Sequence, residues 1–222
     1  YFKLENTLPR NNYFLILYVF FIVGIAGHFS EKFYDAMLAL TPYILFGMGI
    51  FVLIISGVFR SEHFVKWFIV TYLITLSLEV IGVKTGKIFG DYVYGDVLGF
   101  KILGVPLIIG FNWLFVISGA FSLSSMISNN KIIVVFLTAI FSVVFDYLLE
   151  PVAMKLGYWQ WSDGIIPFQN YVAWFLISLT ASAGLIYLKS REATEYFSFN
   201  GSNVFTHYFI AQIIFFSALN FK

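Results

Sequence analysis

Four carboxylates lie within or beside long apolar runs of this sequence, where they could carry out acid–base chemistry. Asp146 and Glu150 are four residues apart, so on a helix they would share one face. Glu79 closes an earlier apolar run, and Asp91 follows it in a glycine-rich stretch, where its ordinary role is to form a turn. An ionisable side chain at membrane depth is costly, so its presence favours a functional role. The functional site is therefore predicted around these side chains.

The chemistry that such carboxyl groups suit is protonation of an apolar substrate. Apolar surroundings disfavour the ionised carboxylate, so the group can stay protonated near neutral pH and act as a general acid. Protonating an isolated alkene yields a carbocation, which aromatic rings can stabilise. Water capture, assisted by a second carboxylate as base, then gives a tertiary alcohol, whereas proton loss gives cyclisation or isomerisation. The expected substrate is a polyisoprenoid dissolved in the bilayer.

A second interpretation stays open for the carboxylates. Long side chains near helix ends can reach the headgroup region, and these acids could pair there with Lys84, Lys87 or Lys155. In that case they would be structural and would not contact a substrate.

The composition is that of an integral membrane protein. Hydrophobic residues make up 60% of the 222 residues and charged residues only 11%, and the mean hydropathy is +0.87. The absence of cysteine excludes disulfides, thiolate nucleophiles and thiol-ligated metals. A net charge of +1 without a basic run argues against nucleic acid as a partner. The partners expected are the lipid bilayer and a substrate dissolved in it.

The apolar runs predict an all-α integral membrane protein, with seven transmembrane helices in one bundle and a single domain over residues 1–222. Each run is long enough to cross a bilayer as a helix. We read the first as an anchor, not a signal peptide. Pro42, Pro106 and Pro167 are expected near helix starts, and Pro151 at a helix end. The predicted spans are 13–29, 38–59, 64–83, 102–127, 132–150, 167–188 and 203–221.

Seven spans place the candidate residues at one membrane face. The third and fifth helices end at the face where the fourth and sixth begin, so the connectors 84–101 and 152–166 meet the carboxylates there. The opposite face, which carries the N-terminus, holds seven basic residues, whereas the face of the predicted site holds six. This small excess predicts a cytoplasmic N-terminus, with the site on the other side of what we expect to be a bacterial inner membrane.

A short pattern occurs twice around these connectors. In each copy a glutamate ends a helix, a loop follows, and a tryptophan lies seven residues after a proline, about two helical turns on. Each copy also contains an asparagine. The two copies are Glu79, Pro106, Asn112, Trp113 and Glu150, Pro167, Asn170, Trp174.

Polar and aromatic residues near the carboxylates are candidates for binding a substrate. Trp113 lies well inside its span, deeper than tryptophans that mark the interface. The loop tryptophans could equally lie in the interface or form a lid; we favour the lid because the carboxylates are adjacent. The predicted substrate-binding residues are Tyr94, Asn112, Trp113, Tyr158, Trp159, Trp161, Asn170 and Trp174.

Several other membrane functions lack the residues that they need. The histidines His28, His63 and His207 are too few and too scattered for a di-iron site. The last span lacks the lysine of a retinal protein, and no aspartate-rich motif for magnesium and diphosphate is present. We therefore expect neither a metal nor a cofactor.

Taken together, these motifs resemble the carotenoid biosynthesis membrane family, which includes carotenoid 1,2-hydratases and bisanhydrobacterioruberin hydratase. The resemblance covers roughly residues 70–180. It rests on the segments Glu79–Tyr94, Gly104–Pro106, Asn112–Trp113, Asp146–Ala153, Gly157–Trp161 and Ile166–Trp174. It implies a cofactor-independent hydratase that adds water across the terminal 1,2 double bond of an acyclic carotenoid end group.

The residue roles are assigned from the chemistry above. Asp146 and Glu150 are the predicted proton donor and base, in either order, while Glu79 and Asp91 could position them or the water. The cation site would be lined by Tyr94, Trp113, Trp159 and Trp161. One alternative is a carotenoid cyclase or isomerase; another is a proton-coupled transporter or lipid-binding scaffold. The sequence does not predict an oligomeric state.

Overall fold

The computed structural model describes residues 10–189 and 204–222. This part of the chain contains seven α-helices, and the described connections between them contain one turn of 3₁₀ helix and four short strands. The helices are α1 (Arg10–Phe29), α2 (Tyr34–Ser56), α3 (Glu62–Thr85), α4 (Leu107–Ile127), α5 (Lys131–Lys155), α6 (Phe168–Lys189) and α7 (Val204–Asn220). The strands are β1 (Tyr92–Tyr94), β2 (Lys101–Ile102), β3 (Val105–Pro106) and β4 (Trp159–Trp161).

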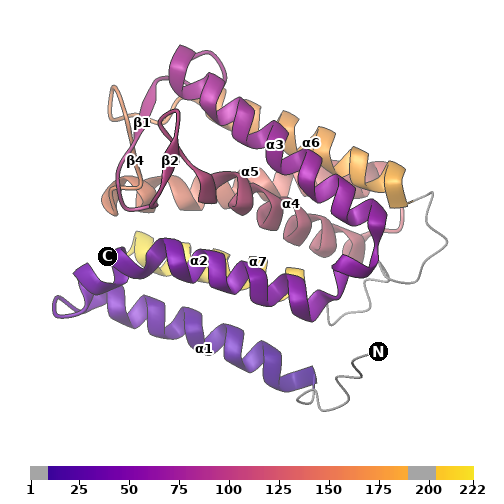
Figure 1. Ribbon diagram of the computed structural model, residues 1–222, viewed down its shortest axis with the longest axis horizontal. Helices are drawn as coiled ribbons and strands as arrows, with labels where there is room; N and C mark the ends of the chain where they lie inside the picture. The colour runs from indigo at the N-terminus through magenta and orange to yellow at the C-terminus, as the bar shows by residue number, and fades with distance from the viewer. Residues whose placement is uncertain (1–9, 190–203) are drawn as a thin grey trace.

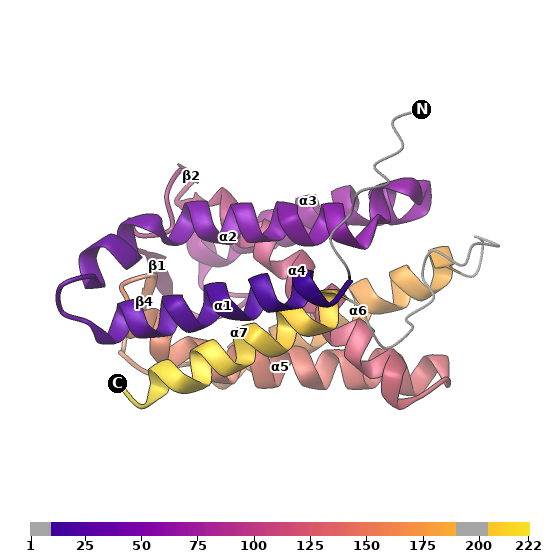
Figure 2. The same cartoon turned by 90° about the horizontal axis from the view of Figure 1, so that it is seen from below.

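The helices form one bundle around α4. This helix packs against α2, α3, α5, α6 and α7, and most of its residues are buried. α1 lies at the outside, against α2 and α7. All the strands lie at one end of the bundle, where α3 and α5 end and where α4 and α6 begin (Figures 1 and 2). The connectors predicted to meet at one face therefore do so.

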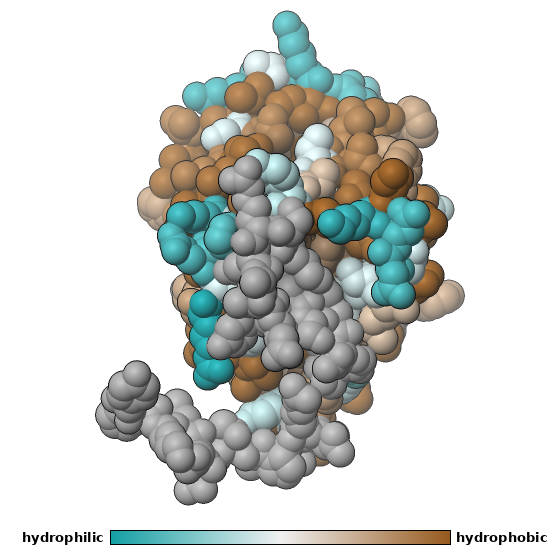
Figure 3. Space-filling view, turned by 90° about the vertical axis from the view of Figure 1, so that its right-hand side faces the viewer, coloured by the Kyte–Doolittle hydropathy of each residue, from teal (hydrophilic) through white to brown (hydrophobic). Residues whose placement is uncertain are grey.

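The outer surface is largely apolar, as a bilayer requires. Five helices, α2 to α6, are long and apolar enough to cross a membrane. The apolar parts of α1 and α7 that the structure describes are shorter, at Tyr13–Phe29 and Val204–Asn220. Figure 3 shows the end opposite the strands, where hydrophilic residues interrupt a surface that is otherwise mostly hydrophobic. That all seven helices cross the membrane stays a prediction.

Polar caps and glycines set the limits of several helices. The Ser61 hydroxyl accepts a hydrogen bond from the backbone N–H of Phe64 at the start of α3, and the Asn130 side chain caps the start of α5 in the same way. Gly86 ends α3 with a positive φ of 64°, a conformation that glycine adopts without strain. The first connector between the site helices therefore begins immediately after Thr85.

Two proline predictions are wrong. Pro151 does not end the fifth helix: α5 continues to Lys155 with the proline inside it. Proline removes one helical hydrogen bond but has a helical φ, and burial of Val152 and Ala153 stabilises the added turn. Pro42 lies in the interior of α2, not near its start, because that helix already begins at Tyr34.

The connectors contain strands that the sequence analysis did not predict. β1 pairs with β4 in an antiparallel ribbon, with Tyr92 opposite Trp161 and Tyr94 opposite Trp159. β2 and β3 form a small hairpin, so α4 begins at residue 107, not at the predicted 102. Gly95 ends the ribbon at a point where a side chain would collide with the backbone of Gly157. The ribbon joins two connectors that are far apart in the sequence.

Candidate active site

An apolar cavity of about 340 Å³ lies beneath the β1–β4 ribbon. Residues from all seven helices line it, together with Tyr92 and Tyr94 of β1 and Trp159 and Trp161 of β4. Its volume lies at the low end of the range for small-molecule sites. Glu79 and Glu150 both lie in its wall, so two carboxyl groups face a space that is otherwise mostly aliphatic and aromatic.

Glu79 of α3 accepts three hydrogen bonds. The hydroxyls of Tyr92 and Tyr94 donate to Oε2 over 2.5 and 2.8 Å, and the indole N–H of Trp113 donates to Oε1 over 2.8 Å. Alternate residues of a strand face the same way, so β1 presents both tyrosines to one carboxylate. All three partners donate to this carboxyl group.

Glu150 of α5 has a comparable set of donors. The indole N–H groups of Trp159 and Trp161 donate to Oε2 over 2.9 and 2.8 Å. The side-chain amide of Asn170 donates to Oε1 over 3.2 Å. Each strand of the ribbon therefore holds one glutamate: β1 holds Glu79 through two tyrosines, and β4 holds Glu150 through two tryptophans.

Asp146 lies one turn further from the ribbon than Glu150, as the four-residue spacing predicts. The Asn170 amide nitrogen donates to its Oδ2 over 2.6 Å, so one amide links the two carboxyl groups. The other oxygen, Oδ1, is buried and has no hydrogen-bond partner among the described residues. Asp146 is fully buried but is not part of the cavity wall. Its hydrogen-bond partner Asn170 does line the cavity.

The twice-occurring pattern corresponds to two packed halves of the site. Trp113 and Trp174, equivalent in the two copies, stack with ring centroids 3.7 Å apart. The halves differ one turn below each glutamate: the first has Thr75 where the second has Asp146. Thr75 hydrogen-bonds the carbonyl of Thr71 in its own helix. The linked pair of carboxyl groups therefore exists in the second half alone.

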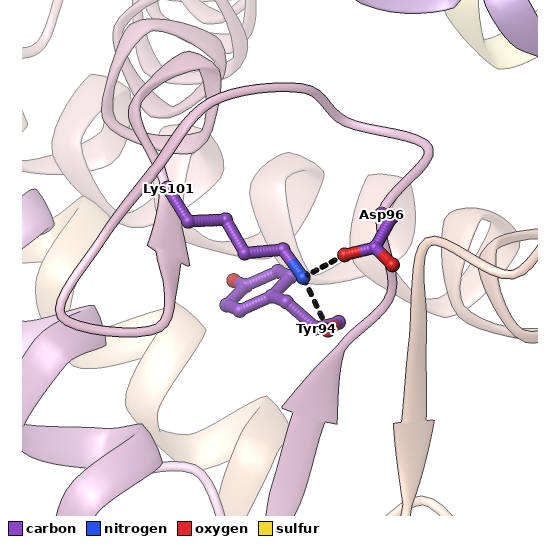
Figure 4. A network of polar contacts seen from close by, with 3 residues as sticks. All are labelled: Tyr94, Asp96 and Lys101. Atoms are coloured by element: carbon purple, nitrogen blue, oxygen red, sulfur yellow. Dashed lines mark hydrogen bonds and ion pairs between the residues drawn. The ribbon is translucent and has the colours of Figure 1, made fainter.

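Tyr94 and Tyr92 lie in a connector, outside the helices. Burial raises the pKa of both phenols, and the charge of Glu79 raises it further. Both therefore stay neutral donors to Glu79 at physiological pH. Lys101 of β2 donates to the backbone carbonyl of Tyr94 over 2.9 Å and pairs with Asp96 over 2.7 Å, and Figure 4 shows this brace from close by. The brace fixes the end of β1 that carries Tyr94.

The structure gathers most of the predicted residues. All eight predicted substrate-binding residues line the cavity, as do Glu79 and Glu150. Asp91 does not: it is exposed, and its backbone carbonyl accepts a hydrogen bond from Ser162. The carboxylates of Glu79, Asp146 and Glu150 bond to aromatic and amide donors, not to the lysines of the structural interpretation.

Other residues of the cavity wall were missed in the sequence. Tyr92 could have been found from its strand spacing with Tyr94. His28, Tyr208 and Gln212 also line the cavity, but they belong to the first and last helices, which the motifs do not reach. Among the residues that the structure describes, no three histidine or acidic side chains gather into a group that could hold a metal ion.

The cavity opens on the side of α1 and α2. Phe20 and Val23 of α1 and Leu40 of α2 line it, yet they are 50%, 58% and 45% exposed. Side chains that line a cavity and also face outward mark its mouth. A side chain at Gly27 of α1 would collide with Met37 of α2, so the two helices pack closely at this point. The mouth therefore faces the surface that lipid would cover.

Comparison with known proteins shows which family the chain belongs to. The chain is 28% identical over 185 residues to bisanhydrobacterioruberin hydratase of Haloarcula japonica; the match covers 77% of this chain and 63% of that protein. The chain thus matches less than two thirds of that relative's length. No solved structure gives a significant match. Residues 39–222 match the family described as carotenoid biosynthesis protein, and the chain therefore belongs to the carotenoid biosynthesis protein family.

Proposed function

We propose that this protein is a carotenoid hydratase, which adds water across the terminal 1,2 double bond of an acyclic carotenoid end group. The observation that carries the proposal is the apolar cavity with Glu79 and Glu150 in its wall, each held by aromatic donors. The family and the similarity to a hydratase support the same substrate class.

The size and the mouth of the cavity fit an end group taken from the bilayer. The volume of about 340 Å³ is at the low end for ligand sites, so it suits one end of a long isoprenoid while the rest stays in lipid. Exposed Phe20, Val23 and Leu40 at the mouth offer this chain an apolar path. A membrane-dissolved substrate would therefore not have to cross the ribbon.

Glu150 is the proposed proton donor. Two buried carboxyl groups linked by one amide are better accommodated with one proton between them than with two negative charges, and Asn170 links Glu150 to Asp146 in this way. Transfer of the proton to the terminal alkene forms a C–H bond, breaks the π bond and leaves a tertiary carbocation. Glu150 is then a carboxylate.

Water completes the reaction. Its oxygen bonds to the cationic carbon, and Glu150 takes one of its protons, so the net change is the addition of one water and the enzyme returns to its starting state. Glu79, with three donors fixing it opposite, stabilises the cation as a preorganised negative charge. The ring faces of Trp113 and Trp174 stabilise the cation further. No cofactor is required by this sequence of steps.

Expression in a bacterial host that makes lycopene tests the proposal. Pigments extracted from cells with the protein should contain a product heavier than lycopene by one water, identified by mass spectrometry. A new pigment of unchanged mass would mean cyclisation or isomerisation instead. Lycopene that stays unaltered in the presence of folded protein would contradict the hydratase and favour a binding scaffold or a transporter.

A further inference from the structure

Gln212 lies near the middle of α7 and faces the cavity. It is only 4% exposed, and its Oε1 has no hydrogen-bond partner among the described residues. Its side chain hydrogen-bonds Tyr208, one turn away on the same face, which also lines the cavity. An amide oxygen buried in apolar surroundings without a partner is costly. The proposed hydration chemistry leaves this group unused.

A second acceptor lies nearby on α4. The hydroxyls of Ser122 on α4 and Thr206 on α7 are 2.5 Å apart, and the two helices run antiparallel (Figure 1). Gln212 lies six residues after Thr206 on α7, and Val116 lies six residues before Ser122 on α4, so the two positions are level with each other. Asn112 is about one further turn along α4. The Oδ1 of Asn112 is also buried and has no partner among the described residues, and Asn112 lines the same cavity.

These groups are neutral, which decides the kind of ligand. Two amide oxygens accept hydrogen bonds, and the Tyr208 hydroxyl can donate one while its oxygen bonds to Gln212. A charged ligand would find no opposite charge among them. A hydroxyl group donates one hydrogen bond, which either amide oxygen can accept, and its own oxygen can accept one from Tyr208.

We propose that Gln212, Tyr208 and Asn112 form a binding site for the hydroxyl of a hydroxylated isoprenoid end group, such as the tertiary alcohol that hydration produces. Only the class of ligand in this proposal rests on the proposed hydratase function; the site itself rests on the geometry. It predicts that the cavity binds an end group with a hydroxyl more tightly than the hydrocarbon from which it derives. The hydrated product would then compete with its own precursor.

Intrinsic fluorescence measures this preference without turnover. Four of the five tryptophans line the cavity, namely Trp113, Trp159, Trp161 and Trp174, so a bound carotenoid quenches them. We would titrate purified protein in nanodiscs with lycopene and with 1-hydroxylycopene. Wild type should bind the hydroxylated form roughly five- to tenfold more tightly, the value of about one net hydrogen bond. Equal affinities would overturn the proposal.

The variant Gln212→Met keeps the length of the side chain and removes the amide. It should lose the preference while its affinity for lycopene stays within about twofold of wild type. Gln169→Met, an exposed amide on α6, is the matched control and should keep the preference. An unchanged preference in Gln212→Met would refute the site. Should that variant fail to fold, Asn112→Leu, on a different helix, must reduce the preference, or the proposal is wrong.

Two further outcomes distinguish the hydroxyl site from a water-holding role of Gln212 and from the hydratase proposal. If Gln212→Met slows hydration of lycopene but leaves the binding preference intact, the amide holds the reacting water and the hydroxyl site is refuted. If wild type prefers the hydroxylated ligand through Gln212 but never hydrates lycopene, the hydroxyl site stands and the hydratase proposal fails.

Discussion

Trp113 stacks on Trp174 with ring centroids 3.7 Å apart and ring planes 24° apart. Trp113 also donates its indole N–H to Glu79, while Trp174 lies one turn from Asn170, which donates to both Asp146 and Glu150. The stack therefore joins the two carboxylate clusters through the floor of one cavity.

Replacing the proposed proton donor should remove the product. Glu150→Gln keeps the shape of the side chain and one accepting oxygen but cannot donate a carboxyl proton, so hydration should fall about 10²- to 10⁴-fold. Asp146→Asn should also lower it, because the linked pair loses its shared proton. Pigment mass spectrometry at equal protein level measures both. Asp163→Asn, an exposed loop carboxylate, is the control; full activity in Glu150→Gln would exclude the proposed role.

The mouth between α1 and α2 should control substrate uptake. Val23→Trp and Leu40→Trp add bulk where the cavity opens, so the conversion of pigment should slow severalfold while the protein stays folded. Val144→Trp makes the same change on the lipid-facing side of α5 and should have no effect. Rates of pigment conversion in membranes measure this. Equal activity of all three variants would place the entrance elsewhere.

The ribbon should not tolerate a side chain at Gly95. A methyl group there would collide with the backbone carbonyl of Gly157, which cannot move independently of the ribbon, so Gly95→Ala should destabilise by about 1–3 kcal/mol. Gly47→Ala, in the open on α2, should instead stabilise by about 0.5–1 kcal/mol. Thermal unfolding in detergent compares the two. A Gly95→Ala protein as stable as wild type would contradict the close approach of the connectors.

Glu79 should depend on its tyrosine donors for stability. Tyr92→Phe removes a hydrogen bond to a buried carboxylate, a loss of about 1–3 kcal/mol. Tyr43→Phe, on the exposed surface of α2, should change little. The measurement is the unfolding midpoint of each variant, and a Tyr92→Phe midpoint equal to that of Tyr43→Phe would mean that the bond contributes nothing.

Stability should fall in alkali through Tyr158, which lies in the connector before β4. Burial raises its pKa to about 12, whereas an unfolded tyrosine titrates near pH 10. Between about pH 10 and 12 the unfolded state releases a proton that the folded state keeps, so this residue lowers the unfolding free energy by about 1.4 kcal/mol per pH unit. Tyr158→Phe should show a shallower decline than Tyr43→Phe when unfolding is followed over this range.

The sequence by itself determined the membrane class, the helix limits within about five residues and the end of the bundle where the candidate residues gather. Long apolar runs must form helices in lipid because no water is present to satisfy their backbone groups, and chain direction alternates from span to span. That is why Glu79, Glu150, Trp113 and Trp174 could be assigned to one end of the bundle before any contact was known.

Only the tertiary structure decided which carboxyl groups face the cavity. The pairing of β1 with β4 joins connectors more than sixty residues apart, and local sequence carries no signal for a contact of that range. This ribbon delivers two donors to each glutamate, leaves Asp91 outside and keeps Asp146 behind the cavity wall. Gln212 gained its place in the same way, because packing of α7 against α4, and no motif, turns it toward the cavity.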